Sequence, residues 1–117
     1  MTLEQIANRL RSHRRMSGLN QCELAQIVGF LSGIPVSRQE RSVTIPTLLI
    51  ALGYEAVFRV PVSELFPGLY RMVEASIEEH LENMENKLQQ SSAKGRQAAY
   101  IARKLEWLWE RKNREAL

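Results

Sequence analysis

The fold of this chain is decided by residues 19–41, whose sequence is LNQCELAQIVGFLSGIPVSRQER. Asn20, followed three residues later by Glu23, is a capping-box pattern that predicts the start of a helix. Gly29 stands where a left-handed C-terminal cap is needed, so we expect this helix to cover about residues 21–28. Its apolar face consists of Leu24, Ala25, Ile27 and Val28.

A second, shorter helix is expected after that turn. Pro35 is tolerated in a first helical turn but disfavours a helical conformation of Ile34 before it. We therefore expect residues 32–34 to form a turn that leads into a helix of about residues 35–41, which is rich in Ser and Arg. Two short helices joined by a Gly-containing turn form a helix-turn-helix, in which the arginines are available for phosphate groups.

A further helix is expected before this pair. Thr2 and Gln5 repeat the capping-box pattern, and apolar residues then follow at the helical spacing. They are Leu3, Ile6, Ala7 and Leu10. The pattern predicts an amphipathic helix that ends near residues 17–18.

Two helices are expected after the pair. Pro46 is a good first residue for a helix that runs to about Phe58 and contains Gly53, where a close packing contact is possible. Its expected apolar face consists of Leu48, Leu49, Leu52, Val57 and Phe58. A one-turn helix follows at residues 62–66, and we expect Pro67 and Gly68 to end it.

The composition changes beyond that point. Residues 69–90 contain no Pro or Gly, and Ile77, Leu81, Met84 and Leu88 alternate the spacings typical of a packed helix. Residues 91–95 form a short linker of helix-ending type, and a last helix is expected over about residues 96–114. Its apolar positions are Ala98, Ile101, Leu105 and Leu108. Because the connection between these two long helices is short, we expect an antiparallel hairpin.

Charge supports the pairing of these two helices. Residues 61–90 hold two basic and six acidic residues, a net charge of −4, whereas residues 91–117 hold seven basic and three acidic residues, a net charge of +4. Trp107 and Trp109 lie about 160° apart on an α-helix and cannot share one buried face. We expect one of them in the core and the other at an interface.

The composition also bounds the function. The 117 residues are 44% hydrophobic, enough for one small domain with an appendage, and the net charge of +3 is too small to identify a polyanionic partner. All 13 acidic residues are Glu, which argues against metal-dependent phosphoryl transfer because Asp is a common ligand of Mg²⁺. His13 and His80 are isolated in the sequence, so we expect neither a metal site nor a cofactor. No Ser-His-acid constellation is present in the sequence, and we do not expect an enzyme.

The single cysteine, Cys22, cannot form an intramolecular disulfide and is expected to be a small buried residue in a reducing compartment. The first 15 residues contain no uninterrupted apolar stretch, and the longest aliphatic run, Leu48–Leu52, is far shorter than a membrane span. We therefore expect a cytoplasmic protein.

Three segments carry a resemblance to a known family: LNQCELAQIVG at residues 19–29, VSRQER at residues 36–41 and VSELF at residues 62–66. Over about residues 6–66 the chain resembles the lambdoid phage repressor and Cro family, also called XRE-type regulators. The resemblance implies an all-α, five-helix, lambda-repressor-like helix-turn-helix domain, which we place at residues 1–68. The antiparallel two-helix extension then covers residues 69–117, which the resemblance does not reach.

The resemblance also implies which residues bind double-stranded DNA. Gln21 matches the residue that opens the second helix, reaches a phosphate and braces the recognition helix. Ser37 and Arg38 match the middle of the recognition helix, where Arg38 can pair with guanine O6 and N7 for about 1–3 kcal/mol of discrimination. Arg41 and Thr44 match positions that touch backbone phosphate.

Three further features belong to the predicted site. Ser32 and Gly33 complete the set of expected DNA-binding residues at the front of the recognition helix. Arg14 and Glu40 match a family pair that joins the first helix to the third, a structural ion pair rather than a reader of DNA.

The chain departs from the family pattern at the recognition helix. One extra residue lies between Gly29 and Ser37, most simply at Leu31 or Ser32, and residues 33–35 offer no side-chain hydrogen bond to a base. Gln39 stands where the family has a bulky apolar residue. Specificity is therefore expected to rest on Ser37 and Arg38, supplemented by DNA shape.

Two functions are compatible with these observations. The first is a sequence-specific transcriptional regulator, expected to be a repressor, that acts as a homodimer on an inverted-repeat operator and dimerises through its C-terminal helices. The second is a protein-interaction module, such as an antitoxin or adaptor, whose C-terminal helices bind a partner protein.

Overall fold

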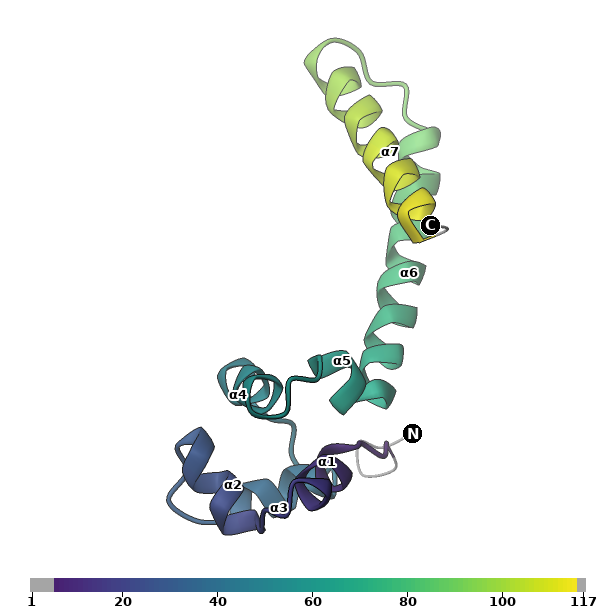
Figure 1. Cartoon of the computed structure of the whole chain (residues 1–117). Helices are drawn as coiled ribbons and strands as arrows, with labels where there is room; N and C mark the ends of the chain where they lie inside the picture. Colours follow the sequence, from purple (N-terminus) through teal and green to yellow (C-terminus); the bar gives the residue numbers. More distant parts are fainter. Residues whose placement is uncertain (1–5, 116–117) are drawn as a thin grey trace. The chain divides into compact units, whose positions relative to one another are not determined.

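The computed structural model describes residues 6–115, and this part of the chain is entirely α-helical, with seven helices and no strand (Figure 1). The helices are α1 (Leu10–Met16), α2 (Gln21–Val28), α3 (Ile34–Glu40), α4 (Leu48–Phe58), α5 (Val62–Leu65), α6 (Pro67–Gln89) and α7 (Arg96–Glu115). The expected all-α class is confirmed. The chain forms two compact units, of which the first ends at Val73 and the second begins at Glu74, within α6.

The first helix begins later than its sequence pattern predicts. The capping box of Thr2 and Gln5 lies outside the described residues, and among those described α1 begins only at Leu10. The backbone N–H of Leu10 donates to Oδ1 of Asn8 at 3.0 Å, and the N–H of Arg9 donates to the carbonyl oxygen of Leu65 at 2.8 Å. The helix expected over residues 6–9 is therefore wrong, because the side chain of Asn8 and the distant carbonyl oxygen of Leu65 accept from N–H groups that a helix would use.

Helix α2 agrees with its local signals, whereas α3 begins one residue earlier than expected because Ile34 is helical. Asn20 and Glu23 form the reciprocal capping box at the start of α2, and Gly29 adopts the left-handed conformation with φ of 98° at its end. Helix α3 includes Pro35 in its first turn, although it begins at Ile34. Capping residues report a boundary well because their hydrogen bonds are local.

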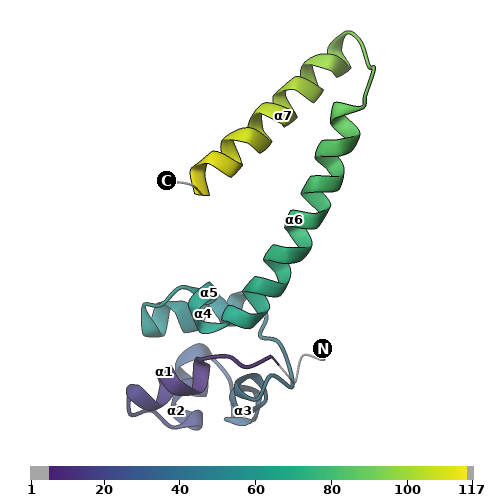
Figure 2. The ribbon, with the colours of Figure 1, turned by 90° about the vertical axis from the view of Figure 1, so that its right-hand side faces the viewer.

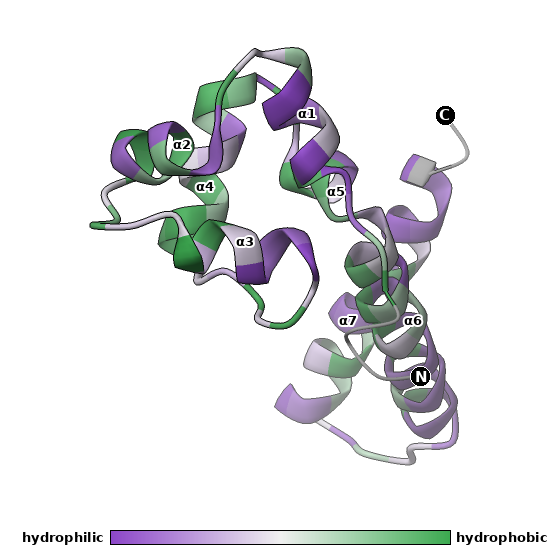
Figure 3. Ribbon diagram, turned by 90° about the horizontal axis from the view of Figure 1, so that it is seen from below, coloured by the Kyte–Doolittle hydropathy of each residue, from purple (hydrophilic) through white to green (hydrophobic). Residues whose placement is uncertain are grey.

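Helix α4 differs from its prediction in its start and in its buried face. Pro46 precedes the helix, and the Thr47 side chain caps α4 by accepting a hydrogen bond from the N–H of Ile50 at 3.3 Å. The buried residues are Ala51 and Tyr54. The expected apolar face is wrong for three of its members, Leu48, Leu49 and Leu52, which are exposed. Nearly the whole helix is apolar, as the hydropathy colours of Figure 3 show, so periodicity does not mark a single buried face.

The first unit is held together by one core cluster. Its buried members come from α1 to α5 and the residue that follows α5: Leu10, Leu24, Ala25, Val36, Tyr54, Leu65 and Phe66. Burial of a large apolar side chain contributes about 1.5–3 kcal/mol, so this cluster is the main stabilising feature of the unit. The close approach expected at Gly53 is not present, since a Cβ there would lie 3.4 Å from Cγ1 of Val28, an ordinary van der Waals contact.

The connection between α5 and α6 is shorter than expected. Helix α5 ends at Leu65, and α6 begins at Pro67 rather than at Leu69. Pro67 and Gly68 therefore lie in the first turn of the next helix. A proline is tolerated there because the backbone N–H at that position has no partner within the helix.

The second unit contains the remainder of α6 and all of α7. The two helices run in opposite directions from the connection at residues 90–95 (Figure 2). Arg111 pairs with Glu78 at 2.5 Å, and Lys112 pairs with Glu85 at 2.6 Å. The basic helix thus contacts the acidic one through side chains of opposite charge.

The apolar side chains of this unit are only partly covered. Leu108 is buried, whereas Trp107 and Trp109 are 43% and 66% exposed. The expectation that one tryptophan lies in the core is therefore wrong, because the leucine between them occupies the buried position. None of the helices in the described part of the chain is long and apolar enough to cross a membrane.

Candidate nucleic-acid interface

Helix α3 has a buried side and an exposed side. Val36 and Gln39 are buried, Ser37 is half-buried and Arg38 is exposed. Arg41, which caps the end of the helix, is also exposed. The side chains that face solvent are thus polar or cationic at the middle and end of the helix.

The turn before α3 depends on a close approach to α2. A Cβ on Gly33 would lie 3.2 Å from the backbone nitrogen of Cys22 and 3.3 Å from the carbonyl carbon of Gln21. Ser32 Oγ accepts a hydrogen bond from the N–H of Ile34 at 3.4 Å. Gly33 and Ser32 therefore help to position the start of α3. Cys22 is exposed, so the expectation of a buried cysteine is wrong.

Glu40 joins α3 to α1 and α2. Its carboxylate accepts hydrogen bonds from Arg14 at 2.5 Å and 3.1 Å, and from Nε2 of Gln21 at 3.1 Å. The side chains of Arg14 and Glu40 are only 9% and 2% exposed. Arg14 also donates to the carbonyl oxygen of Leu19 at 2.9 Å. The ion pair that the family resemblance implies is present, and Gln21 binds one of its partners.

The electrostatic effect of this pair is seen at Arg14. The hydrogen bond to Glu40 raises the pKa of Arg14 above its ordinary value, against an opposing effect of burial. The guanidinium of Arg14 is therefore held in its charged form. Removal of one partner would leave the other as a buried, unpaired charge, which costs about 3–5 kcal/mol.

Gln39 has a partner that sequence reasoning did not identify. The hydroxyl of Tyr54, on α4, donates a hydrogen bond to Oε1 of Gln39 inside the core. Burial raises the pKa of Tyr54, and the nearby charge of Glu40 raises it further, so the hydroxyl keeps its proton. The buried side-chain amide of Gln39 thus has a phenol hydroxyl as its hydrogen-bond partner.

The end of α3 is also tied to the segment before α1. Asn8 Nδ2 donates to the carbonyl oxygen of Gln39 at 2.9 Å and to Oγ of Ser42 at 3.1 Å. Ser42 Oγ in turn donates to the carbonyl oxygen of Ile6 at 2.5 Å. Asn8 and Ser42 were not singled out from the sequence, because their partners are more than 30 residues away and no local pattern marks them.

The loop after α3 carries the last predicted contact. Ser42 adopts a positive φ of 59°, and the N–H of Val43 donates to the carbonyl oxygen of Arg38 at 2.8 Å. Thr44 follows as an exposed residue. Arg41 and Thr44 are therefore exposed on either side of the turn at residues 42–43, which the hydrogen bond from Val43 to Arg38 closes.

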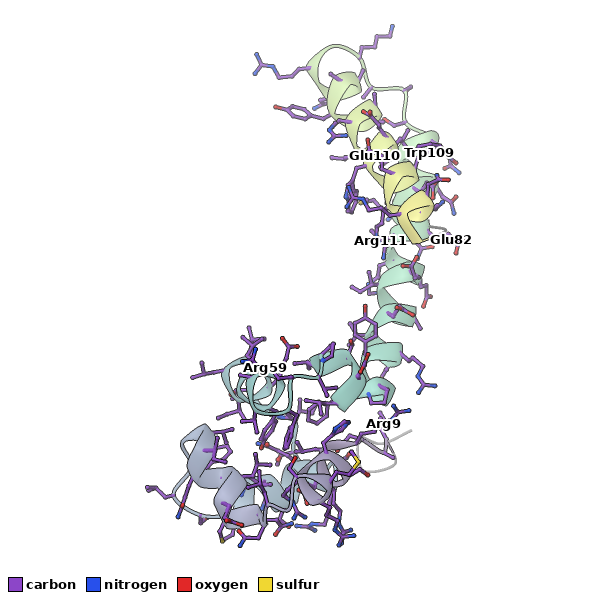
Figure 4. All side chains as sticks on the ribbon, viewed as in Figure 1. Arg9, Arg59, Glu82, Trp109, Glu110 and Arg111 are labelled. Carbon is purple, nitrogen blue, oxygen red and sulfur yellow. The ribbon has the colours of Figure 1, made fainter. Side chains whose placement is uncertain are left out.

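The first unit accounts for the whole net positive charge of the chain. Its sequence up to Val73 holds eight arginines against five glutamates, a net charge of +3. Arg9 and Arg59 are also exposed, the first just before α1 and the second at the end of α4 (Figure 4). Arg38 and Arg41 are the cations that α3 and its cap contribute. Within residues 6–115 no group of three or more His, Cys, Asp or Glu side chains could hold a metal ion.

Comparison with known proteins finds no relative of this chain. No family model matches the chain, and no curated protein or solved structure matches it.

Proposed function

We propose that this chain is a sequence-specific DNA-binding transcriptional regulator in which α2 and α3 form a helix-turn-helix. The observation that carries the proposal is the asymmetry of α3. One side of the helix is fixed by Glu40 and Gln39, which are bound to α1, α2 and α4, while Arg38 and Ser37 lie on the other side. A rigid helix with free polar side chains is what recognition of base edges in the major groove requires.

Each predicted residue has a role in this proposal. Arg38 pairs with a guanine, and Ser37 binds a neighbouring base edge. Arg41 and Thr44 bind backbone phosphates and fix the register of α3 on the duplex. Gln21 contributes a phosphate contact and, through Glu40, braces the recognition helix. Ser32 and Gly33 bring the start of α3 to the DNA.

The fold proposed for the first unit is the five-helix, lambda-repressor-like domain. The order and lengths of α1 to α5, with a glycine turn between α2 and α3, support it. Helices α6 and α7 form the two-helix extension. The regulator acts as a repressor in the cytoplasm and needs no cofactor.

A homodimer completes the proposal, because one recognition helix of seven residues gives too small an interface for specific affinity at physiological salt. The exposed Trp109 and the partly covered apolar side chains of α6 and α7 support dimerisation through the C-terminal helices. Two copies of α3 then reach major-groove faces about 34 Å apart, so the operator is an inverted repeat.

Selection of binding sites from a random pool of duplex oligonucleotides tests the proposal. We expect a two-fold symmetric sequence to be enriched by the full chain. Arg38→Ala relaxes the preference at one base pair of each half-site, whereas Arg59→Ala, the matched control on another exposed arginine, leaves the sequence preference unchanged. The absence of any enriched sequence with the unmodified chain would refute the proposal.

The second candidate function is that of an antitoxin or adaptor. The observation that favours it is the front of α3, where Leu31 and Ile34 are exposed and present no hydrogen-bonding side chain. In this case Arg38→Ala leaves DNA affinity unchanged, and Trp109→Ala weakens binding of a protein partner in co-purification.

A further inference from the structure

Helix α7 carries an ordered row of side chains on a side other than its aliphatic one. Six residues of this row follow one another at spacings of four or three residues, which places them within about 80° of arc around the helix. They are Arg96, Tyr100, Lys104, Trp107, Arg111 and Arg114. We refer to these six residues as the α7 ridge. Each aromatic ring of the ridge therefore has a cation about one turn before it and one turn after it.

The α7 ridge is exposed along most of its length. Tyr100 and Trp107 are 60% and 43% exposed. Arg96, Lys104 and Arg114 are exposed as well. The ridge therefore offers two rings and three cations to a ligand.

The other charges near the α7 ridge are bound to partners. Arg111 pairs with Glu78 of α6 at 2.5 Å, so its charge does not contribute to the proposal. Glu106 and Glu110 lie beside the ridge on α7, and both pair with Arg103, at 3.4 Å and 3.9 Å. The ridge itself contains no acidic residue, so the charge that it presents is positive.

We propose that the α7 ridge binds single-stranded nucleic acid, with bases stacked on its two rings and phosphate groups bound by its exposed cations. Proteins that bind single strands combine cations that follow the backbone with aromatic side chains on which bases stack. A duplex keeps the faces of its bases inside the stack, so the rings favour an unpaired strand. This inference goes beyond the proposed function, which assigns a duplex to α3 and gives the ridge no role.

The composition of the α7 ridge disfavours two other occupants. If two copies of the chain met ridge to ridge, cations would lie opposite cations. An anionic membrane would attract the cations, but a helix at a membrane surface must also bury an apolar face in the lipid. The aliphatic side chains of α7 do not lie on the ridge, since Leu108 is buried and Ile101 and Leu105 are half-buried. Insertion of the two rings would also desolvate the charged groups between them.

Two variants with a single tryptophan test the proposal by fluorescence. Trp109→Phe leaves only Trp107, which belongs to the ridge, and Trp107→Phe leaves only Trp109, about 160° away around the helix. Both side chains are exposed, so both variants should fold. The probe is an oligothymidylate of about ten nucleotides, a length that such sites cover. We expect saturable quenching of Trp107 by a stacked base and no saturable change at Trp109.

Charge variants in the Trp109→Phe chain show which cations are used. Lys104→Ala should weaken binding of the oligothymidylate severalfold and should make its salt dependence shallower, by about 0.7 in the slope of log K against log salt. Lys87→Ala, the matched control on an exposed lysine of α6, should change neither. Arg38→Ala should also change neither, because the proposed reader of duplex DNA is a different site.

Equal quenching of the two tryptophans, or no saturable quenching of Trp107, would overturn the proposal. A response of Trp107 to vesicles of phosphatidylserine and phosphatidylcholine, with none to the oligothymidylate, would overturn it in favour of a membrane. The proposed function fails separately. If Trp107 is quenched but the unmodified chain selects no duplex sequence, the proposed function is refuted and the α7 ridge stands, and the opposite pair of results refutes the ridge alone.

Discussion

The hydrogen bond between Tyr54 and Gln39 allows a quantitative test of how α3 is fixed. Both groups lie in the core, and the phenol is fully buried. Tyr54→Phe leaves the side-chain carbonyl oxygen of Gln39 without its donor. Gln39→Leu leaves the phenol hydroxyl of Tyr54 without its acceptor. A buried polar group that loses its partner costs about 1–3 kcal/mol, so each single variant should be destabilised by that amount.

The double variant Gln39→Leu/Tyr54→Phe removes both polar groups. Because no buried group is then left unsatisfied, its stability should lie closer to that of the unmodified chain than the two single losses would suggest. We expect a coupling free energy of about 1–3 kcal/mol between the two positions.

The assay must report on the first unit alone. Both tryptophans belong to α7, so tryptophan fluorescence follows the other unit. Native-state hydrogen exchange of the α2 and α3 amides gives the free energy of opening where it is needed. Losses that add within about 0.5 kcal/mol would show that the two groups act independently and would refute this account.

Three further predictions follow from contacts described above. Glu40→Ala leaves Arg14 buried and unpaired and should cost about 3–5 kcal/mol in urea unfolding followed by α2 amide signals; a loss below about 1 kcal/mol would contradict a buried pair. Gly33→Ala brings a methyl group against the backbone of α2 and should destabilise the unit by about 1–3 kcal/mol; a stabilised variant would show that the turn can relax. The hydrogen bond from Arg111 lowers the pKa of Glu78, so its contribution is present above the unfolded pKa of about 4.3 and is lost as the pH falls through the lower folded value. The protection factors of the α7 amides, which correct for the intrinsic pH dependence of exchange, should therefore fall on acidification, less so in Glu78→Gln than in the control Glu79→Gln; identical pH profiles would count against the contact.

The sequence predicts those parts of the fold that local hydrogen bonds decide. Helix α2 begins and ends where Asn20 and Gly29 indicate, because a capping box and a left-handed glycine act within one turn. The start of α1 could not be predicted in the same way. It depends on Asn8, whose side-chain partners Gln39 and Ser42 are distant in sequence.

The buried face of α4 illustrates a second limit. Leu48 and Leu49 are as apolar as any core residue, yet Ala51 and Tyr54 are the buried ones. A helix that is apolar on most sides can bury any one of these sides. The side that carries Tyr54 is the buried one because its hydroxyl donates a hydrogen bond to Gln39. The identity of that partner is a tertiary fact that no window of sequence contains.

The candidate site divides along the same line. The sequence placed Arg38, Arg41 and Thr44 at positions that are exposed, and it paired Arg14 with Glu40. Their contacts with DNA stay predictions. The contact between Tyr54 and Gln39, which also fixes α3, was missed, because a buried glutamine and its phenol partner carry no motif.

Ser42 has a practical consequence for handling the protein. Its hydroxyl ties the backbone at Ile6 to the loop after α3, while its own backbone accepts the strain of a positive φ. Ile6, the first described residue, is thus hydrogen-bonded to the loop that directly follows the helix proposed to bind DNA. Variants prepared for binding measurements should therefore keep Ser42 and the backbone at Ile6 unchanged.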